Sequence, residues 1–300
     1  MKSNYELCLS GESCIFVPYR PDHLPNYHEW MQDPFLLEAT ASEPLSMDEE
    51  IKMQREWRYD EKKCTFILLA RDLCCSQPGE EKNNDIIPPP PPTESEMSEK
   101  KKPYPQLVEQ TLDAMIGDIN LFLSEEELEE SEDDQQQRIE QLASQSTTTT
   151  PENLTQGELD LMIAAASHRH KNLGTELALT MMHYGAKHLQ LRRFFVKIKD
   201  TNHSSLKLFK EKLGFVQCAY AECFGEYELE CKCETSELMM EWVERRYYGQ
   251  QLLWAKKKKS VMVGDDADGE GCDDDNDDDQ CSRRPCRMYD VYKCPLDSSA

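Results

Sequence analysis

The stretch from Leu159 to Leu179 places the strongest constraint on the fold. It begins with an apolar run, continues through a basic loop at 169–174, and ends in the periodicity of an amphipathic helix. A strand that leads through such a loop into a helix presents the unpaired N–H groups of the first helical turn, and the helix dipole favours negative charge there. The sequence therefore predicts an anion site, suited to a pyrophosphate, at the start of this helix.

The acidity of the chain is concentrated in two short runs. Residues 125–134 contain eight acidic residues and residues 265–279 contain ten, without a base in either, so the two runs carry −18 of the net charge of −24. The remainder is mildly acidic, which does not indicate a nucleic-acid-binding surface. The runs are interpreted as solvated segments, with contact to a basic partner as the alternative.

Cysteine spacing and hydropathy indicate an intracellular protein. The thirteen cysteines include no paired C-x-x-C spacing, which favours reduced structural thiols over disulfides or a metal site. The first eleven residues lack the apolar core of a secretory signal, and no window approaches the roughly 20 apolar residues that span a bilayer. We expect a cytoplasmic or nuclear protein that binds no metal, nucleic acid or membrane.

Predicted elements surround two low-complexity inserts. In the first half, Ser46 and Glu49 have the spacing of a capping box at the start of a helix, and apolar runs predict buried strands. The elements expected there are a strand at 13–17, helices at 22–32 and 46–57, and strands at 64–70 and 114–124. We predict one domain at 11–245, disordered inserts at 76–112 and 125–156, and a disordered acidic tail at 260–300.

The second half alternates strands and helices. Strands at 159–165 and 194–199 enclose a helix at about 174–190, so they are predicted to pair in parallel through a right-handed crossover. A second helix, at about 204–213, stops at Gly214. Strands at 215–219 and 224–231 and a helix at 234–259 follow. The predicted fold class is α/β, with a mixed sheet.

Two motifs in this half resemble the GCN5-related N-acetyltransferases. The loop Arg169-His170-Lys171-Asn172-Leu173-Gly174 resembles their Q/R-x-x-G-x-G/A signature, with Asn172 in place of one glycine. About thirty residues later, the run from Asn202 through Ser205 and Phe209 to Phe215 resembles their second motif. Upstream, five segments resemble the N-acetyltransferase 9 branch of that superfamily. They are residues 17–19, 27–31, 40–45, 64–67 and 117–123.

The resemblance implies both a fold and a cofactor. It implies a mixed sheet of six to seven strands flanked by helices, in which the strands at 159–165 and 194–199 splay around acetyl-CoA. An amide of Ile163 or Ala164 would face the thioester carbonyl, and Arg169 and Lys171 can add charged contacts to the pyrophosphate. The implied cofactor-binding residues are Ile163, Ala164, Arg169, His170, Lys171, Asn172, Leu173, Gly174, Thr175, Asn202, Ser205 and Phe209.

Two of these positions depart from the family pattern. Asn172 tolerates a left-handed backbone but brings a side chain close to the phosphates, so we expect weaker cofactor binding than with glycine. Phe209 stands where many relatives have a tyrosine that protonates the leaving thiolate, so that role is vacant or moved. The run from Phe209 to Phe215 is one residue longer than usual, which implies a bulge or a shifted helix end.

Acetyl transfer requires a neutral amine and a group that accepts its proton. An α-amine, with a pKa of about 7.8, is easier to neutralise than a lysine at about 10.4, which favours N-terminal acceptors. Glu158 and Asp160 alternate with the apolar face of their strand and are the candidate bases, acting through water; solvent-exposed edge charges are the alternative. Asp118 and Asn120 are assigned a structural role in preference to a contact with substrate.

The leading hypothesis is an acetyl-CoA-dependent N-acetyltransferase acting on a protein or peptide amine. The resemblance further implies that the acceptors are the N-termini of tubulins and that the activity affects microtubule stability. No residue pattern in the chain itself indicates tubulin. A non-catalytic binding protein that keeps the fold is the alternative from another class. A small-amine acetyltransferase is the alternative within the enzyme class.

Overall fold

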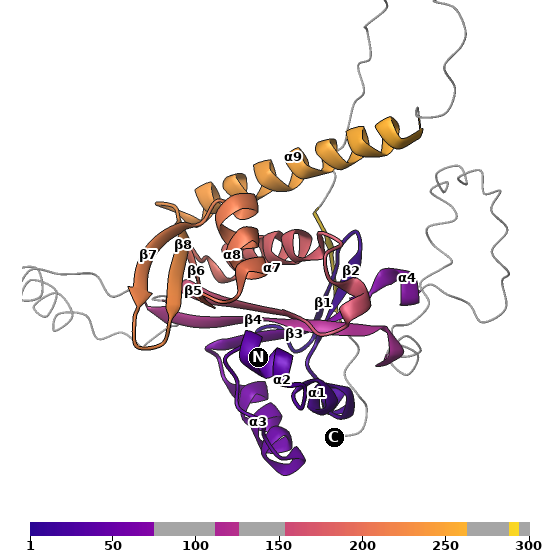
Figure 1. Cartoon of the computed structure of the whole chain (residues 1–300), viewed down its shortest axis with the longest axis vertical. Coiled ribbons are helices and arrows are strands. Elements are labelled where there is room, and N and C mark those ends of the chain that lie inside the picture. The colour runs from indigo at the N-terminus through magenta and orange to yellow at the C-terminus, as the bar shows by residue number, and fades with distance from the viewer. Residues whose placement is uncertain (75–111, 126–153, 263–287, 294–300) are drawn as a thin grey trace, which may run out of the picture.

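The computed structural model describes residues 1–74, 112–125, 154–262 and 288–293 (Figure 1). The predicted inserts lie almost wholly outside these ranges. The elements before the second gap are β1 (Leu7–Ser10), β2 (Cys14–Pro18), α1 (Leu24–Trp30), α2 (Pro34–Ala39), α3 (Met47–Tyr59), β3 (Lys63–Ala70), α4 (Arg71–Cys74) and β4 (Met115–Glu125). Those after it are β5 (Leu154–Ile163), α7 (Leu173–Leu189), β6 (Arg193–Lys199), α8 (His203–Leu206), β7 (Val216–Ala221), β8 (Glu226–Lys232), α9 (Ser236–Met262) and β9 (Asp290–Lys293).

One sheet organises all the described strands. Their order is β7-β8-β6-β5-β4-β3-β2-β1-β9, so the described part of the chain has nine strands instead of the six or seven expected. The two additional strands are β1 and β9, at one edge of the sheet. There β1 pairs with both β2 and β9, in each case antiparallel. The mixed α/β class is confirmed, since β5 and β6 are parallel and their other neighbours are antiparallel.

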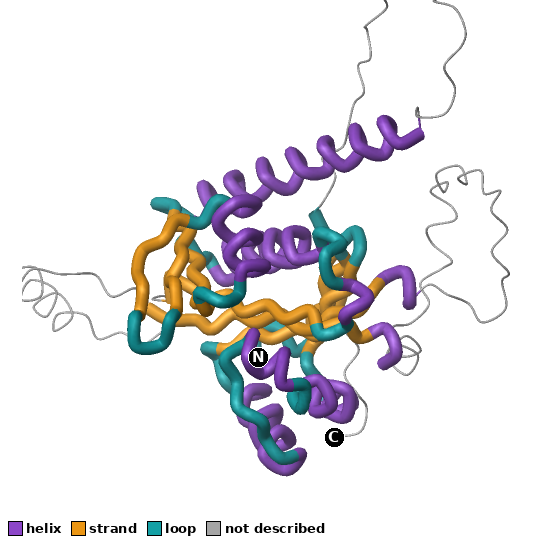
Figure 2. Tube along the Cα trace, in the orientation of Figure 1, coloured by secondary structure: helices purple, strands orange, loops and turns teal. Residues whose placement is uncertain are grey.

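Helices cover both faces of the sheet, which gives the three layers seen in Figure 2. We call the face under α7, α8 and α9 the upper face and the face over α1, α2 and α3 the lower face, as in Figure 1. The upper core includes Leu177, Met181 and Phe194, and the lower core includes Tyr27, Ile67 and Met162. Alternate residues of each central strand therefore enter opposite cores.

The start of α3 confirms the predicted capping box. The Ser46 hydroxyl accepts from the Glu49 N–H at 3.4 Å, and the Glu49 carboxylate accepts from the Ser46 N–H at 2.9 Å. Both orphan N–H groups at the helix start are thereby satisfied. This local signal was sufficient to place the first turn of α3 from the sequence.

The parallel pair of β5 and β6 is confirmed, and it opens along its length. Pairing joins only Gln156–Glu158 to Arg193–Phe195, although β5 continues to Ile163 and β6 to Lys199. α7 forms the crossover between them on the upper face. The two strands therefore splay toward their carboxyl ends, as the family resemblance implied.

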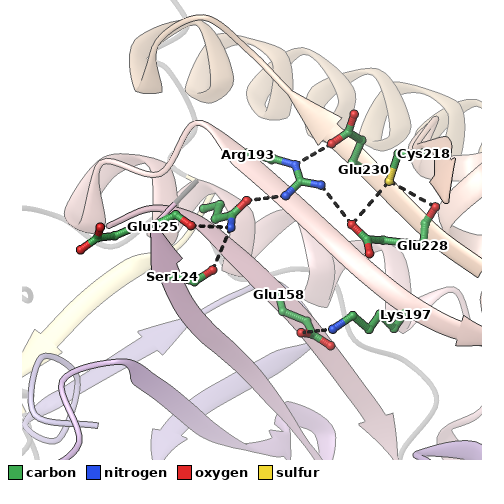
Figure 3. Close-up of polar contacts among 9 residues, drawn as sticks. Ser124, Glu125, Glu158, Arg193, Lys197, Cys218, Glu228 and Glu230 are labelled. Atoms are coloured by element: carbon green, nitrogen blue, oxygen red, sulfur yellow. Dashed lines mark hydrogen bonds and ion pairs between the residues drawn. The ribbon is translucent and has the colours of Figure 1, made fainter. Parts of the chain in front are cut away.

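A side-chain clamp lies at the closed end of this opening. Arg193 donates to Glu230 at 2.5 Å, to Glu228 at 3.1 Å and to the amide oxygen of Gln156, as Figure 3 shows. Gln156 in turn donates to the Ser124 hydroxyl at 3.0 Å. Because these contacts join β4, β5, β6 and β8, they hold together the strands that separate further along.

The extra residue between Phe209 and Phe215 forms a bulge. Residues Lys207–Leu213 adopt a π-helical turn after α8, and the Phe215 N–H donates to the Phe209 carbonyl at 2.9 Å. Gly214 ends the turn with a φ of 74°, which favours glycine. One inserted residue widens the helical hydrogen-bond ring, so the predicted bulge is confirmed.

Residues 288–293, which lie inside the predicted tail of 260–300, pack against the domain and include β9. Met288 and Tyr289 are buried, Tyr289 contacts His183 of α7 at 3.1 Å, and β9 pairs with β1. The apolar residues of this segment cover an edge strand that would otherwise expose its hydrogen-bonding groups. The acidic run before it obscured this signal, and β1 and β9, which lie outside the predicted bounds of 11–245, join the same sheet.

Within the described residues, no helix combines the length and the apolar character that a membrane crossing requires. The cysteines in these ranges form no disulfide, and among them Cys8, Cys14, Cys64 and Cys231 are buried.

Candidate active site

A cavity of about 480 Å³ occupies the opening between β5 and β6. We call it the upper cavity. It is lined by β5, β6, the loop before α7, the first turn of α7, the segment from α8 through the π-helical turn, and α2 with the following Thr40. The predicted residues in its wall are Asp160, Ile163, Arg169, His170, Asn172, Leu173, Gly174, Thr175, Asn202, Ser205 and Phe209. The two family motifs, separated by about thirty residues, therefore meet at one cavity.

Ala164 and Lys171 lie outside this wall. Ala164 is 8% exposed and belongs to the lower core, and Lys171 is exposed. Lys207 and Lys212, which were not predicted as site residues, line the cavity instead. Both lysines lie on the polar side of the second motif's helix, and this position is the sequence signal that could have identified them. The roles of Ile163 and Ala164 toward a thioester remain predictions.

The loop before α7 enters the helix through left-handed residues. His170 and Asn172 have φ values of 60° and 62°, and Asn172 is the N-cap of α7. The Asn172 carbonyl accepts from the Thr175 N–H at 3.2 Å, and its side-chain oxygen accepts from Lys212 at 2.7 Å. Asn172 therefore adopts the left-handed backbone that asparagine tolerates, and its side chain is held by a lysine of the cavity wall.

Arg169 secures this loop to the end of β5. Its guanidinium donates to the carbonyls of Ile163 at 2.8 Å and Ala164 at 2.6 Å, and it lies 4.9 Å from the ring centre of Phe35 in α2. These contacts fix the path from the strand to the helix. The predicted contact between Arg169 and a pyrophosphate remains a prediction, since in this structure the guanidinium binds backbone oxygens.

Thr175 supplies an unpartnered polar group to the upper cavity. Its side chain is 1% exposed, and its hydroxyl has no hydrogen-bond partner among the described residues. Such a group is costly to bury, and here it adjoins the N–H groups of the first turn of α7. Together with Lys207 and Lys212, these donors fit a phosphate-bearing ligand.

The second motif is held rigidly against this cavity. Asn202 caps α8, because its side-chain oxygen accepts from the Ser205 N–H at 3.1 Å. Phe209 is 4% exposed and packs edge-to-face on Phe215 with ring centres 5.2 Å apart. Phe209 therefore contributes an apolar wall and no proton.

A second cavity, of about 540 Å³, lies on the lower side of the same opening. We call it the lower cavity. It is walled by β4, β5, α1, α3 and the loop 40–45, which links α2 to α3 and was among the segments resembling the N-acetyltransferase 9 branch. Its charged lining residues are mostly acidic: Glu43, Glu50, Glu158, Asp160, Glu226 and one base, Lys197.

The two cavities meet at β5 and β6. Thr40, Leu159, Asp160 and Lys197 line both of them. A ligand in the upper cavity and a ligand in the lower cavity would therefore approach each other beside Asp160. This junction is where a group could pass from one to the other.

The predicted bases occupy this junction with different surroundings. Glu158 forms an ion pair with Lys197 at 3.2 Å, as Figure 3 shows. Burial, and next the Glu158 charge, raise the pKa of Asp160 to about 6. A general base is most effective with a pKa near the working pH, so Asp160 is the better placed of the two.

A buried polar row continues from Asp160 into the sheet. Asn120 on β4 lies directly opposite Asp160, and its amide donates to Asp118 at 2.9 Å. Burial, and next the Asp160 charge, raise the pKa of Asp118 to about 7. The structural role assigned to Asn120 from the sequence is incomplete, because Asn120 also lines the lower cavity. Asp118 and Asn120 lie on one face of an otherwise apolar strand, and this pattern is the sequence signal for a site there.

Comparison with known proteins identifies the family. A family model described as "Acetyltransferase (GNAT) domain" matches residues 93–216. An N-acetyltransferase 9-like protein from Nematostella vectensis is 36% identical over 229 residues, which cover 76% of this chain and 87% of the relative. This chain belongs to the N-acetyltransferase 9 family. The expected GCN5-related N-acetyltransferase fold is thereby confirmed, and acetyltransferases of this fold use acetyl-CoA.

The N-acetyltransferase 9 family also includes a human protein named "Alpha/beta-tubulin-N-acetyltransferase 9". It is 34% identical to this chain over 238 residues, covering 79% of this chain and 88% of the human protein. Among solved structures, spermidine N-acetyltransferase from Vibrio cholerae, in complex with CoA and spermine, matches with a TM-score of 0.45 and 14% identity. That match covers 78% of this chain and 99% of the bacterial one.

No cluster of metal-binding side chains accompanies this site in the ranges that the structure describes.

Proposed function

We propose that this chain uses acetyl-CoA to acetylate the N-terminal α-amines of α- and β-tubulin in the cytoplasm, and that it thereby affects microtubule stability. The name of the human relative supports tubulin as the acceptor. The observation that carries the proposal is the junction of a cavity rich in phosphate-binding donors with an acid-lined cavity, beside Asp160.

The upper cavity suits the cofactor. The first-turn N–H groups of α7, the unpartnered Thr175 hydroxyl, Lys207 and Lys212 surround a space between splayed strands. Pyrophosphate oxygens accept hydrogen bonds from all of these donors. The apolar side of the cavity, which includes Leu161 and Phe209, suits the less polar arm that leads to the thioester.

The lower cavity suits an amine. Its five carboxylates outnumber Lys197, whose ammonium is already paired with Glu158. Such a wall attracts a cationic acceptor and repels an anionic one. An α-amine enters as an ammonium and must lose one proton before it reacts, and its pKa of about 7.8 makes that loss easier than for lysine.

Acetyl-CoA supplies a thioester whose carbonyl carbon forms a bond to the amine nitrogen as the C–S bond breaks and CoA leaves as a thiolate. Asp160 accepts the proton that the ammonium gives up before attack, directly or through one water, and the second proton, which leaves the nitrogen as the amide forms, passes to solvent. Glu158 and Lys197 form the adjoining rim, where their ion pair leaves Asp160 as the unpaired carboxylate at the junction. Phe209 cannot protonate the thiolate, which therefore takes its proton from solvent.

Incubation of the purified chain with acetyl-CoA and N-terminal octapeptides of α- and β-tubulin tests the proposal. We expect the free-amine peptides to gain one acetyl group by mass spectrometry. The matched controls are the same peptides with a blocked α-amine and an internal lysine, which we expect to remain unmodified. Release of CoA without peptide acetylation, or acetylation at lysine alone, would contradict the proposal.

The effect on microtubules needs its own assay. Tubulin treated with the chain and acetyl-CoA is assembled and then cooled, and the surviving polymer is compared with that from tubulin treated with Asp160→Asn. We expect the two survival curves to differ. Superimposable curves, together with confirmed acetylation, would remove microtubule stability from the proposal and leave the transferase activity intact.

A further inference from the structure

Asn120 places an unpartnered acceptor in the wall of the lower cavity. Its side chain is 3% exposed, and its Oδ1 has no hydrogen-bond partner among the described residues. A buried acceptor without a partner destabilises the folded state. Its location at the edge of a cavity, and not within packed core, indicates that a ligand supplies the missing donor.

Two carboxylates determine which way the Asn120 amide faces. Its Nδ2 donates to Asp118 at 2.9 Å, and the same side chain is hydrogen-bonded to Asp160. Above a pH of about 7 both carboxylates are ionised and only accept hydrogen bonds, so the NH₂ group faces them there. The carbonyl oxygen is consequently left without a donor from this row, in a side chain that lines the lower cavity.

This oxygen lies next to the candidate base. Asn120 and Asp160 are direct partners in the β4–β5 register, so their side chains stand side by side on the lower face. A bound amine has several N–H groups: one can be directed at Asn120 while another gives its proton to Asp160. The geometry thus offers an acceptor that holds the amine and a neighbour that deprotonates it.

We propose that Asn120 Oδ1 accepts a hydrogen bond from the acceptor amine and holds it beside Asp160, and that Asp118 acts as a positioning residue through the Asn120 amide. This inference rests on the proposed function of the lower cavity. It assigns recognition of the amine itself to β4, independently of which polypeptide carries that amine.

A thermodynamic cycle between protein and ligand tests the contact. The α-tubulin octapeptide and its des-amino analogue, in which hydrogen replaces the α-amine, are titrated by calorimetry into the chain saturated with CoA. The wild-type chain is expected to bind the amine form about tenfold to a hundredfold more tightly, the value of a hydrogen bond to a charged group. In Asn120→Ala this preference falls at least about threefold, while CoA affinity stays unchanged. An undiminished preference in Asn120→Ala would overturn the inference.

Thr65→Val is the matched control. Thr65 lies opposite Asn120 on β3, is 1% exposed and carries an unpartnered hydroxyl, but it does not line the lower cavity. Its replacement disturbs the same row of the sheet without reaching the amine. We expect the amine preference of Thr65→Val to equal that of the wild type, and a matching loss in both variants would contradict a direct contact.

The role of Asp118 is tested by Asp118→Asn, which keeps the shape but not the fixed charge. An amide at 118 both donates and accepts, so the orientation of Asn120 is no longer enforced. We expect KM for the peptide to rise about threefold or more, with kcat and KM for acetyl-CoA changing less. Equal losses in all three parameters would indicate a general structural defect and remove the positioning role.

Two further arms keep the inference testable. If Asn120→Ala fails to fold, a wild-type preference for the amine of about one overturns the inference by itself. If the octapeptide does not bind, the tubulin proposal fails, and n-propylamine is then titrated while the Asn120 side-chain amide is followed by NMR. A saturable shift, absent with n-propanol, supports the contact to Asn120, and no shift overturns it.

Discussion

The two cavities on either side of the β5–β6 opening have similar volumes and opposite chemistry. The upper cavity offers N–H donors at the start of α7 with Lys207 and Lys212, whereas the lower cavity is lined by Glu43, Glu50 and three further carboxylates. Such walls would draw an anionic ligand to the upper cavity and a cationic ligand to the lower one. The sheet opening therefore connects the two cavities and also separates two electrostatic environments.

Asp160→Asn should give the largest effect, because this residue lies where the two environments meet. We expect kcat for peptide acetylation to fall about 10²- to 10⁴-fold, the range for loss of a general base. The wild-type kcat/KM should rise with pH through about 6, since Asp160 must be ionised to accept a proton. Steady-state kinetics from pH 5 to 9 measure both. A variant that retains the wild-type profile would show that another group is the base.

Asp118→Asn tests the electrostatic character of the lower side through stability. The folded chain holds this proton more tightly than the unfolded chain, because the pKa rises from 3.8 to about 7. The native state therefore binds more protons between these values, and stability falls as pH increases across them. We expect the variant to be more stable by on the order of 2–4 kcal/mol at pH 8 and near wild type at pH 4.5.

Chemical unfolding at the two pH values measures this difference. The exposed Asp113→Asn serves as the control and should match the wild type at both. Equal stability of Asp118→Asn and wild type at pH 8 would mean that the buried carboxylate is not under electrostatic stress.

Gly174→Asp tests the opposite cavity. A carboxylate at the second position of α7 favours the helix dipole but repels phosphate in the upper cavity. We expect acetyl-CoA to bind at least about tenfold more weakly by calorimetry, with the fold retained. Gly174→Ala is the matched control: its Cβ would meet only the flexible end of Leu208, at 2.9 Å. If Ala weakens binding as much as Asp, then space and not charge explains the loss.

Asn172→Gly should give the smallest effect. Glycine adopts the φ of 62° without strain, and its introduction frees Lys212, which now donates to the Asn172 side chain at 2.7 Å. We expect acetyl-CoA to bind about two- to fivefold more tightly, equivalent to less than about 1 kcal/mol. Equal or weaker binding would show that Asn172 does not limit affinity.

Local signals predicted much of the fold. The capping box at Ser46 and the stop at Gly214 depend on neighbours within a few residues, and the structure confirms both. The extra residue before Phe215 likewise revealed a bulge. β9 was missed because a four-residue strand has little signal of its own, and it forms only where β1 offers an edge.

The candidate site likewise has features that local sequence predicts and features that depend on tertiary packing. Sequence alone determined the strand, loop and helix from Leu159 to Leu179 and the α/β class, because hydrophobic periodicity and helix-start signals act over short distances. Only the tertiary structure decided that Arg169 binds backbone carbonyls, that Lys207 and Lys212 face the cavity, and that Asn120 stands beside Asp160. These relations depend on strand register and on the depth at which each group is buried, and both arise when distant segments pack together.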